Sequence, residues 1–527
     1  MHVYIIVRIK FVLKNLGDKM KSLKVSKIGK LILIILLFFI TSINEKALAA
    51  ENHNDLDISK IDEYMNNELK RQKIPGASIA IVKGDKVQYI KGYGISGPNG
   101  NKMTPQTPVV LGSVSKSFTA LAIMQLVDQG KIQLDKPVQH YIPWFRVADE
   151  EASKEITIRH LLNHTSGISE YEGQRAISEG DQSLKKLVES LKGLRLEKKV
   201  GESYQYSNLN YAILGLVIEE VTKTPYDEYI KRNIYKPLQM VNSYTDPKED
   251  KNNTIATGYE TMFGFKLPTE QLNHEANVPH GYLISSAEDM ANYMMAILNK
   301  GQFKGERVLT KQSMDEMHQP SSLIKDHTYY AMGWEVDDDV ISHNGWTENT
   351  YTRVLLDSEY GITLLINSFD YLNSNRYDQM VTDIYNFVKH NKPLKSSEEN
   401  PFMIYIIFDL IIVVAMVFIT FSIYKIFKRQ KRKVKPLRVI VNVVSLLVFN
   451  FLLPLLILYE FTLVAPLSTV TLFVPGIGHA LFIISLSLII IDVIKIGKLI
   501  RIKLKTDKGS KENWRVIEFD ETNHKIV

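Results

Sequence analysis

The 527-residue sequence contains no cysteine. This absence excludes disulfide bonds, a thiolate nucleophile and every metal site that needs cysteine ligands. The sequence also contains no internal repeat. Its formal net charge of +6 is modest, and the basic residues are unevenly distributed along the chain. Long apolar runs occur only near the two ends, whereas the region between them alternates polar and apolar residues as globular domains do.

The N-terminal region predicts a secretory signal peptide over residues 1–49. An apolar run at residues 31–40 follows a basic stretch and precedes the small residues Ala47-Leu48-Ala49, which favour cleavage before Ala50. The basic stretch contains Lys21, Lys24, Lys27 and Lys30. Residues 1–19 are unusual for a signal, so Met20 is a candidate for the true start. An uncleaved anchor helix is the alternative interpretation.

Residues 50–395 predict one extracytoplasmic α/β domain. Apolar periodicity predicts helices over residues 55–71, 113–129, 156–162, 208–222, 286–298 and 376–390. Residues 77–94 predict two strands joined at Lys83-Gly84-Asp85, and four further strand-like runs lie between residues 329 and 367. Strands at both ends with helices between them favour one antiparallel sheet that both ends of the domain build, with an all-α insertion.

Residues 396–527 predict a membrane region. The segments 403–424, 437–459 and 470–494 are each apolar and long enough to cross a bilayer. Buried core helices are a poor alternative, since three such runs would have no soluble surface against which to pack. We therefore expect a bundle of three transmembrane helices followed by a basic tail.

Charge placement predicts the topology of this region. The loop between the second and third segments has no Lys or Arg. The loop after the first segment contains Lys425, Lys428, Arg429, Lys431, Arg432, Lys433, Lys435 and Arg438, and the tail contains Lys495, Lys498, Arg501, Lys503 and Lys505. The positive-inside rule places this loop and the tail in the cytoplasm, so that residues 50–400 lie outside the cell, as the signal peptide also requires.

Three ionisable residues lie within or near the apolar segments, namely Asp409, His479 and Asp492. Such residues invite a functional interpretation. We expect Asp492 to be hydrated near the cytoplasmic edge. For Asp409, a partner inside the helix bundle and a functional role are both open.

The stretch LGSVSKSFTA at residues 111–120 predicts a nucleophile. Ser113 and Lys116 are three residues apart, so they share one face of a helix. A serine hydroxyl needs an adjacent base, and a lysine becomes one when burial among apolar neighbours lowers its pKa. Placement of Ser113 at a helix N-terminus also directs free backbone N–H groups toward a developing oxyanion. Alone, this spacing is a weak signal.

Two later stretches strengthen it. Tyr206-Ser207-Asn208 precedes the helix predicted at 208–222, and His343-Asn344-Gly345 ends a predicted strand. In this order the three motifs resemble the serine β-lactamase and penicillin-binding protein superfamily, over residues 55–390. The class C-like branch is the most similar, because it has tyrosine in the second motif and often histidine in the third. Similar stretches include GYG at Gly92, HLLNHTSGI at His160 and GYLISSAEDM at Gly281.

This resemblance implies a β-lactamase/transpeptidase-like fold and a role for each matching residue. Ser113 is acylated, and Lys116 and Tyr206 share the proton transfers, with Tyr206 either as a phenolate or as a relay to the leaving group. Asn208 orients Lys116 and the substrate amide. His343 takes the place of the strand lysine that meets a substrate carboxylate. The backbone N–H groups of Ser113 and Trp346, the residue after Gly345, form the oxyanion hole, and the Trp346 side chain narrows the cleft.

Other histidines are assigned no chemistry. His164, between polar and glycine neighbours, predicts a packed turn. His274 and His280 are too far apart for one helix face, and Pro279 argues against a helix there. We therefore expect no metal and no cofactor.

The resulting expectation is a membrane-anchored serine hydrolase of a Gram-positive bacterium. Its substrates would be D-amino-acid amides or esters, as in a cell-wall DD-peptidase acting on peptidoglycan stem peptides or an esterase acting on D-alanylated wall polymer. The signal, hydrolase domain and three spans are similar to the plan of Flp- and FmtA-like membrane proteins and of prodrug-activating peptidases. Those peptidases usually carry an acidic residue three positions before the nucleophile, where this chain has Val110.

Two further alternatives stay open. A β-lactamase of this branch needs no separate deacylating glutamate. A non-enzymatic sensor of β-lactams or wall fragments would acylate and stop, although the sequence shows no evident cytoplasmic signalling domain. No nucleic-acid partner is expected, and the sequence leaves the oligomeric state open.

Overall fold

The computed structural model describes residues 56–396, 400–428, 441 and 443–518. All of them except Leu56 belong to one compact unit, Asp57–Val527. The predicted signal peptide at 1–49 and most of the basic loop after the first apolar segment lie outside the described residues.

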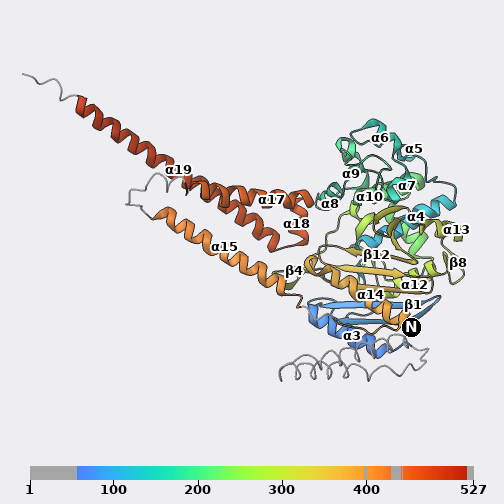
Figure 1. The fold of residues 1–527 in the computed structure, drawn as a ribbon. Coiled ribbons are helices and arrows are strands. Elements are labelled where there is room, and N and C mark those ends of the chain that lie inside the picture. Colours follow the sequence, from blue (N-terminus) through green and yellow to red (C-terminus); the bar gives the residue numbers. More distant parts are fainter. Residues whose placement is uncertain (1–55, 397–399, 429–440, 442, 519–527) are drawn as a thin grey trace, which may run out of the picture. The chain divides into compact units, whose positions relative to one another are not determined.

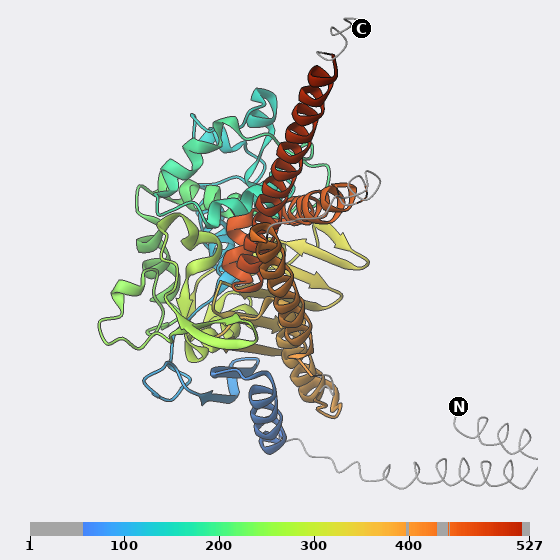
Figure 2. The same ribbon diagram turned by 90° about the vertical axis from the view of Figure 1, so that its left-hand side faces the viewer.

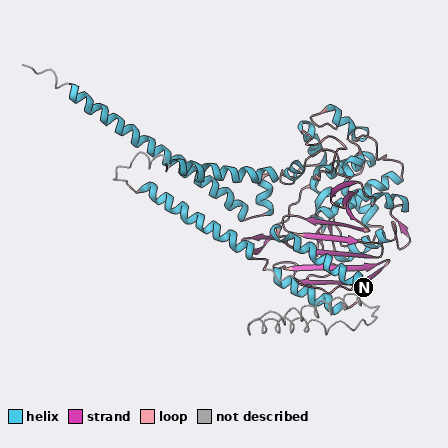
Figure 3. Cartoon of the chain, in the orientation of Figure 1, coloured by secondary structure: helices cyan, strands magenta, loops and turns pink. Residues whose placement is uncertain are grey.

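One eight-stranded antiparallel sheet is the frame of the domain (Figures 1 and 3). Its strand order is β2-β1-β14-β13-β12-β11-β10-β9. The strands are β1 (Gly76–Lys83), β2 (Lys86–Gly94), β9 (Ser322–Lys325), β10 (Thr328–Ala331), β11 (Trp334–Asp337), β12 (Val340–Trp346), β13 (Tyr351–Leu356) and β14 (Tyr360–Ile366). Because β1 pairs with β14, with Ala77 opposite Ile366, the two ends of the domain build one sheet, as predicted.

The run at residues 329–336 is two strands rather than one. Gly333, at φ 83°, turns the chain between β10 and β11. Its missing side chain also matters, since a Cβ atom there would come within 2.8 Å of the Ser117 Cα atom. The glycine therefore reverses the chain directly against the helix that contains Lys116.

Helices cover both faces of the sheet. On one face α14 (Ser374–His390) packs on β13 and β14, and α3 (Ile58–Gln72) packs beside it through a hydrogen bond from Tyr64 to Asp383. On the other face α12 (Ala287–Leu298) packs on β1 and β14. Successive side chains of β13 point to opposite faces of the sheet. Arg353 contacts Asp378 of α14 on one face, and the next residue, Val354, belongs to the main apolar core on the other.

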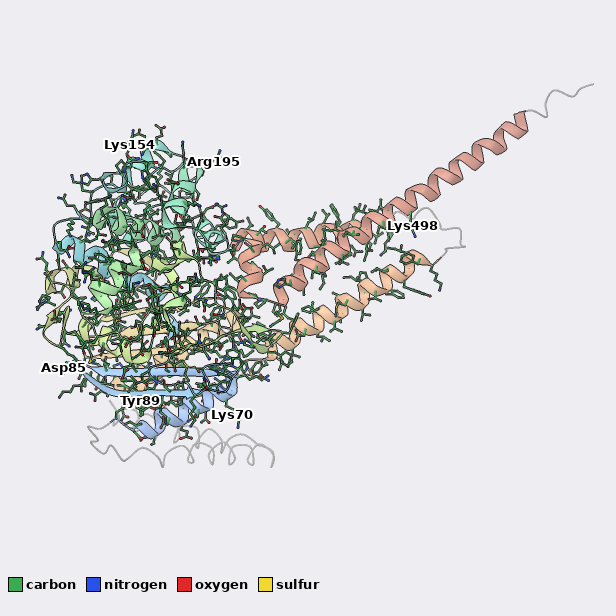
Figure 4. All side chains as sticks on the ribbon, turned by 180° about the vertical axis from the view of Figure 1, so that it is seen from behind. Lys70, Asp85, Tyr89, Lys154, Arg195 and Lys498 are labelled. Carbon is green, nitrogen blue, oxygen red and sulfur yellow. The ribbon has the colours of Figure 1, made fainter. Side chains whose placement is uncertain are left out.

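The insertion predicted to be all-α lies between β2 and β9 and is mainly helical, but it also contains three short strand pairs (Figure 4, where Lys154 and Arg195 mark it and Asp85 marks the β1–β2 turn). Its helices include α4 (Ser115–Asp128), α5 (Val138–Tyr141), α6 (Glu150–Glu155), α7 (Ile158–Leu162), α8 (Glu170–Ile177), α9 (Leu184–Ser190), α10 (Asn208–Thr222), α11 (Tyr226–Ile230) and α13 (Lys311–Met317). Nearly all of α4 and α10 is buried, so these two helices form its centre. Gly215 of α10 permits this close packing, because a Cβ atom there would meet the Pro279 ring at 2.5 Å.

Short strand pairs and single turns complete the domain. The pairs are β3 (Val109–Val110) with β6 (Ile284–Ser285), β4 (Gly258–Met262) with β5 (Phe265–Thr269), and β7 (Gln302–Phe303) with β8 (Glu306–Arg307). Val110, the residue three before Ser113, is buried in the first of these pairs. Of the turns, η1 (Gly112–Val114) and η6 (Val278–Tyr282) both adjoin α4.

Among the described residues of the C-terminal region, two helices are long and apolar enough to cross a membrane, and they lie within α15 (Met403–Phe427) and α19 (Ile477–Glu518) (Figure 2). A shorter apolar helical stretch, Val443–Leu456, occupies part of the second predicted span and continues as α17 (Leu453–Val464). The third predicted span is wrong at its start. Residues 470–473 belong to a separate short helix, α18 (Leu467–Phe473), because Pro475 and Gly476, at φ 79°, break the chain before α19.

Two of the ionisable residues in this region can be placed. Asp492 is buried and accepts a hydrogen bond of 3.0 Å from the Asn450 amide, so the expectation of a hydrated carboxylate is wrong. Asp409 is half-buried, and one of its oxygen atoms has no hydrogen-bond partner among the described residues.

Candidate active site

Ser113 lies in η1, a single turn of 3₁₀ helix directly before α4. The α-helix itself begins at Ser115, two residues later than predicted. Gly112 makes the turn possible. It has φ 57°, and a Cβ atom on it would come within 2.2 Å of the Trp346 backbone nitrogen. Only glycine fits this left-handed position against the neighbouring strand.

Lys116 is fully buried in the first turn of α4. Its Nζ atom lies 2.9 Å from Ser113 Oγ, 2.8 Å from Asn208 Oδ1 and 2.7 Å from the His280 carbonyl oxygen. The predicted serine–lysine pair is therefore formed, and two oxygen acceptors from distant parts of the chain hold the lysine in place.

The pKa of Lys116 lies well below its ordinary value because burial disfavours the ammonium form. Lys116 Nζ donates to all three oxygens, including Ser113 Oγ. A neutral amine keeps only two N–H groups, which the oxygens of Asn208 and His280 can accept. Its lone pair would then be free to take the hydroxyl proton of Ser113, as a general base does beside its nucleophile.

Tyr206 lies just before α10 and donates its hydroxyl to Ser113 Oγ at 2.8 Å. Burial raises the pKa of this phenol well above its ordinary value, although the hydrogen bond to Ser113 opposes the shift. The Lys116 Nζ atom lies 4.7 Å from the centre of the Tyr206 ring. Of the two roles expected for Tyr206, the geometry favours the proton relay over the phenolate.

Asn208 is the first residue of α10 and joins two walls of the site. Its Oδ1 atom accepts from Lys116, and its Nδ2 atom lies 3.4 Å from the Gly173 carbonyl oxygen of α8. A Cβ atom on Gly173 would come within 2.7 Å of Ser207 Oγ and of the Asn208 backbone nitrogen. Helix α8 therefore packs directly on the second motif.

His343 of β12 is buried, and its ring faces Tyr330 and lies 6.5 Å from the Tyr206 ring. Burial, and next the charge of Lys116, lower its pKa to about 3. A neutral imidazole does not supply the positive charge of the lysine that it was expected to replace. His343 can offer a hydrogen bond to a substrate, but not an ion pair with a carboxylate.

The end of β12 lies against η1 at backbone distance. A Cβ atom on Gly345 would come within 2.1 Å of the Leu111 carbonyl oxygen and 2.7 Å of the Ser113 backbone nitrogen. Likewise, a Cβ atom on Gly112 would come within 2.2 Å of the Trp346 backbone nitrogen. These contacts place the N–H groups expected to form the oxyanion hole beside each other. The half-exposed Trp346 indole stacks on Phe369 at 5.3 Å, with the rings 2° from parallel.

Sequence reasoning missed two parts of the site. The first is the His280 carbonyl, because every residue carries a carbonyl and nothing in the sequence marks this one. The second is His164, at φ 55° and fully buried, whose Nδ1 atom accepts from the Ser207 backbone N–H at 3.1 Å. Burial lowers the pKa of His164 well below its ordinary value. The predicted packed turn is therefore also a support for the segment that carries Tyr206.

The histidines of the 274–280 segment are also placed. His280 Nε2 contacts the Asn277 side chain at 3.2 Å, and Asn277 also contacts His274. Within the described ranges, the structure contains no group of three or more His, Asp or Glu side chains that could hold a metal ion.

Comparison with known proteins agrees with this geometry. Residues 59–385 match the family described as Beta-lactamase. Protein flp of Staphylococcus aureus strain N315 is 32% identical over 342 residues, which cover 63% of this chain and 67% of that protein. Penicillin-binding protein 4 of Amycolatopsis lactamdurans is 30% identical over 269 residues, covering 50% of this chain and 70% of that protein.

A solved structure shows the same fold. The crystal structure of FmtA from Staphylococcus aureus aligns with a TM-score of 0.55 and 23% sequence identity. The alignment covers 72% of this chain and 99% of that chain. The resemblance inferred from the three motifs is thus confirmed over the region in which it was expected. By its sequence, its sheet and the order of its motifs, the chain belongs to the beta-lactamase family.

Proposed function

We propose that the chain is a membrane-anchored serine hydrolase that cleaves D-amino-acid esters or amides outside the cell through an acyl-enzyme on Ser113. The observation that carries this proposal is the set of contacts around Lys116, whose nitrogen reaches Ser113 Oγ, Asn208 Oδ1 and the His280 carbonyl at once. A buried lysine held by two neutral oxygens has the environment of a base.

Acylation follows from these contacts. The Ser113 hydroxyl proton moves to Lys116 Nζ as Ser113 Oγ attacks the substrate carbonyl carbon. The carbonyl oxygen gains negative charge and is stabilised by the N–H groups of Ser113 and Trp346. When the tetrahedral intermediate collapses, the Tyr206 hydroxyl gives its proton to the leaving oxygen or nitrogen, and the proton that Lys116 Nζ took from Ser113 restores the phenol. Water then repeats the same steps on the acyl-enzyme, so that the acid is released and Ser113 is restored.

The neutral state of His343 supports an esterase or endo-acting enzyme over a carboxypeptidase. A D-Ala-D-Ala carboxypeptidase binds a substrate that ends in a carboxylate. Because the pKa of His343 is about 3, this side chain carries no charge to pair with that group at neutral pH. A D-alanyl ester of a wall polymer requires no such pairing, and we take it as the substrate class that fits best.

The two long apolar helices support a membrane anchor. Together with the charge pattern of the sequence, they favour a domain at residues 50–395 on the outer side of the membrane. In that position the substrates within reach are wall polymers, stem peptides and added β-lactams.

The test is incubation of the purified chain with a fluorescent penicillin, a D-alanyl ester and a D-Ala-D-Ala peptide, followed by mass spectrometry of Ser113 and of the products. We expect an adduct on Ser113 and free D-alanine from the ester. The Ser113→Ala variant, which removes only the nucleophile, is the matched control. A wild-type chain that no probe acylates would contradict the proposal, and a penicillin adduct without turnover of any substrate would favour a sensor.

A further inference from the structure

Phe473, the last residue of α18, packs on the oxyanion-hole residue Trp346. The two rings are 5.0 Å apart at the centroids and perpendicular, at 87°. Phe473 also meets Phe369 at 6.4 Å, and it is only 7% exposed. Edge-to-face and stacked arrangements are the ones that aromatic pairs prefer, and each adds stability beyond the burial of area. A side chain of the C-terminal membrane region is thus part of the cluster that holds Trp346.

The same short helix is anchored at a second place. The Thr469 hydroxyl, which is buried, donates to the Gln174 carbonyl oxygen of α8 at 3.1 Å. Next to it, the hydroxyl oxygens of Ser468 and Ser178 lie 2.9 Å apart. Helix α8 is the helix that packs on Ser207 and Asn208 through Gly173.

Helix α18 therefore joins the two walls between which Ser113 lies. One wall is the insertion, where α8 supports the Tyr206–Asn208 segment. The other is the end of β12, where the Trp346 backbone nitrogen meets η1. Helix α18 thus contacts both walls.

The turn after α18 is tied down as well. A Cβ atom on Gly476 would come within 2.9 Å of the Met262 side chain in β4, and the neighbouring Phe263 ring is almost as close. At the near end of α15, the buried Tyr405 hydroxyl donates to Asp370 Oδ1 at 2.5 Å. The outer end of the membrane region thus contacts the domain at α8, at Trp346, at the β4–β5 hairpin and at Asp370.

We propose that α18 is a structural part of the active site, in which Phe473 is a positioning residue for the oxyanion hole. This inference rests on the proposed function, because it assumes that Ser113 is acylated. The membrane region then sets the rate of acylation as well as anchoring the enzyme.

The first test is the kinetics of acylation by a fluorescent penicillin, measured on the full chain in membranes. Phe473→Ala should lower the first-order acylation rate constant about tenfold, because displacing a backbone donor by a fraction of an ångström weakens the oxyanion contact. The apparent dissociation constant should change less than twofold, and Phe473→Tyr, which keeps the ring, should restore the rate. The matched control is Phe482→Ala, which removes a more exposed ring from α19.

The outcomes separate the two proposals. If the wild-type chain is not acylated at all, the proposed function fails. If it is acylated and Phe473→Ala reacts within twofold of the wild type, the positioning role is overturned. A general loss of folding would lower the fraction of labelled protein rather than the rate constant, so the two effects are measured separately.

The second test uses the absence of cysteine. In the chain with Ser178→Cys and Ser468→Cys, the two new thiols should form a disulfide under mild oxidation, because the hydroxyl oxygens that they replace are 2.9 Å apart. Ser178→Cys with Val493→Cys, on the exposed side of α19, is the control pair and should stay reduced. A first pair that stays reduced while both thiols react with a maleimide would overturn the placement of α18.

Discussion

Lys116 Nζ lies 2.8 Å from Asn208 Oδ1, although the two residues belong to different motifs and different helices. The contact connects the start of α4 with the start of α10, the two most deeply buried helices of the insertion. It holds the lysine nitrogen beside Ser113 Oγ, 2.9 Å away. The relative positions of Ser113, Lys116 and Asn208 therefore depend on the packing of one pair of helices.

Replacement of Lys116 by arginine should leave the enzyme almost inactive. Arginine keeps a positive charge but has a pKa too high for a base, and its planar group does not match the two oxygens that hold Lys116 Nζ. We expect the acylation rate to fall at least about a thousandfold, by loss of general-base catalysis. The measurement is penicillin labelling of Lys116→Arg beside wild type. Near-normal turnover in this variant would reassign the base to Tyr206.

Stability should depend on pH through Lys116. Below about pH 10.4 the unfolded chain carries a proton on Lys116, whereas the folded chain, with its lowered pKa, does not, so stability rises with pH in this window. Relative to Lys116→Met, the wild type should lose up to ~1.4 kcal/mol per pH unit as pH falls from about 10 toward the folded pKa. Denaturant unfolding in detergent at several pH values measures this slope. A difference that does not vary with pH would mean that the lysine is protonated in the folded state.

Removal of the Tyr206 hydroxyl should slow acylation without changing its dependence on low pH. Tyr206→Phe loses the donor to Ser113 Oγ, and loss of a positioned proton donor costs about 10²–10⁴-fold in rate. Because the pKa of the Tyr206 phenol is raised, the acidic limb of the rate profile belongs to Lys116 and should persist in the variant. Disappearance of that limb in Tyr206→Phe would identify Tyr206 as the base.

The enzyme should be nearly indifferent to a terminal carboxylate on its substrate. His343 is neutral because its pKa is about 3. A D-Ala-D-Ala peptide and its C-terminal amide should therefore have kcat/KM values within about threefold of each other. The free-energy difference that corresponds to this ratio is under half of what a hydrogen bond to a charged group provides. Hydrolysis assays with this matched pair of peptides check the expectation. A much faster reaction of the free acid would point to a cation at the site and restore the carboxypeptidase interpretation.

The hydrolase domain should lie outside the cell, with the C-terminus inside. The eight basic residues from Lys425 to Arg438 each gain about 1 kcal/mol near an anionic surface, so translocating the group is strongly unfavourable. Protease added to wall-stripped cells should degrade the domain and spare a tag placed after Val527 until the membrane is breached. Cleavage of the tag in intact cells, with Ser113 protected, would show the inverted topology.

Sequence alone predicted those elements whose local pattern and tertiary environment agree. The helix at 208–222 is found with the predicted bounds, because an uninterrupted apolar run follows a clear start at Asn208. The β1–β2 hairpin is found because Gly84, at φ 56°, supplies the conformation that its turn needs. Ser113, Lys116, Tyr206 and Asn208 come together as expected.

The errors have physical causes too. Apolar residues continue through 470–474, so hydropathy alone extended the third span across a turn that Pro475-Gly476 could have revealed. The sequence shows the identity of His343, which places it where the family has a strand lysine, but not its burial, which only the structure reveals. The contact between Phe473 and Trp346 joins segments that no local pattern relates, and only tertiary structure brings them together.

The pairing of β1 with β14 constrains how the protein is made. Ala77 finds its partner Ile366 only after almost the whole domain has been synthesised, and contacts so distant in sequence close slowly. Helices α4 to α11 depend more on local contacts and can form while the chain is still emerging. The surroundings of Ser113 are completed last, when β12 reaches η1 and α18 follows it. Ser113 therefore lies in an incomplete site until nearly the whole chain has been synthesised.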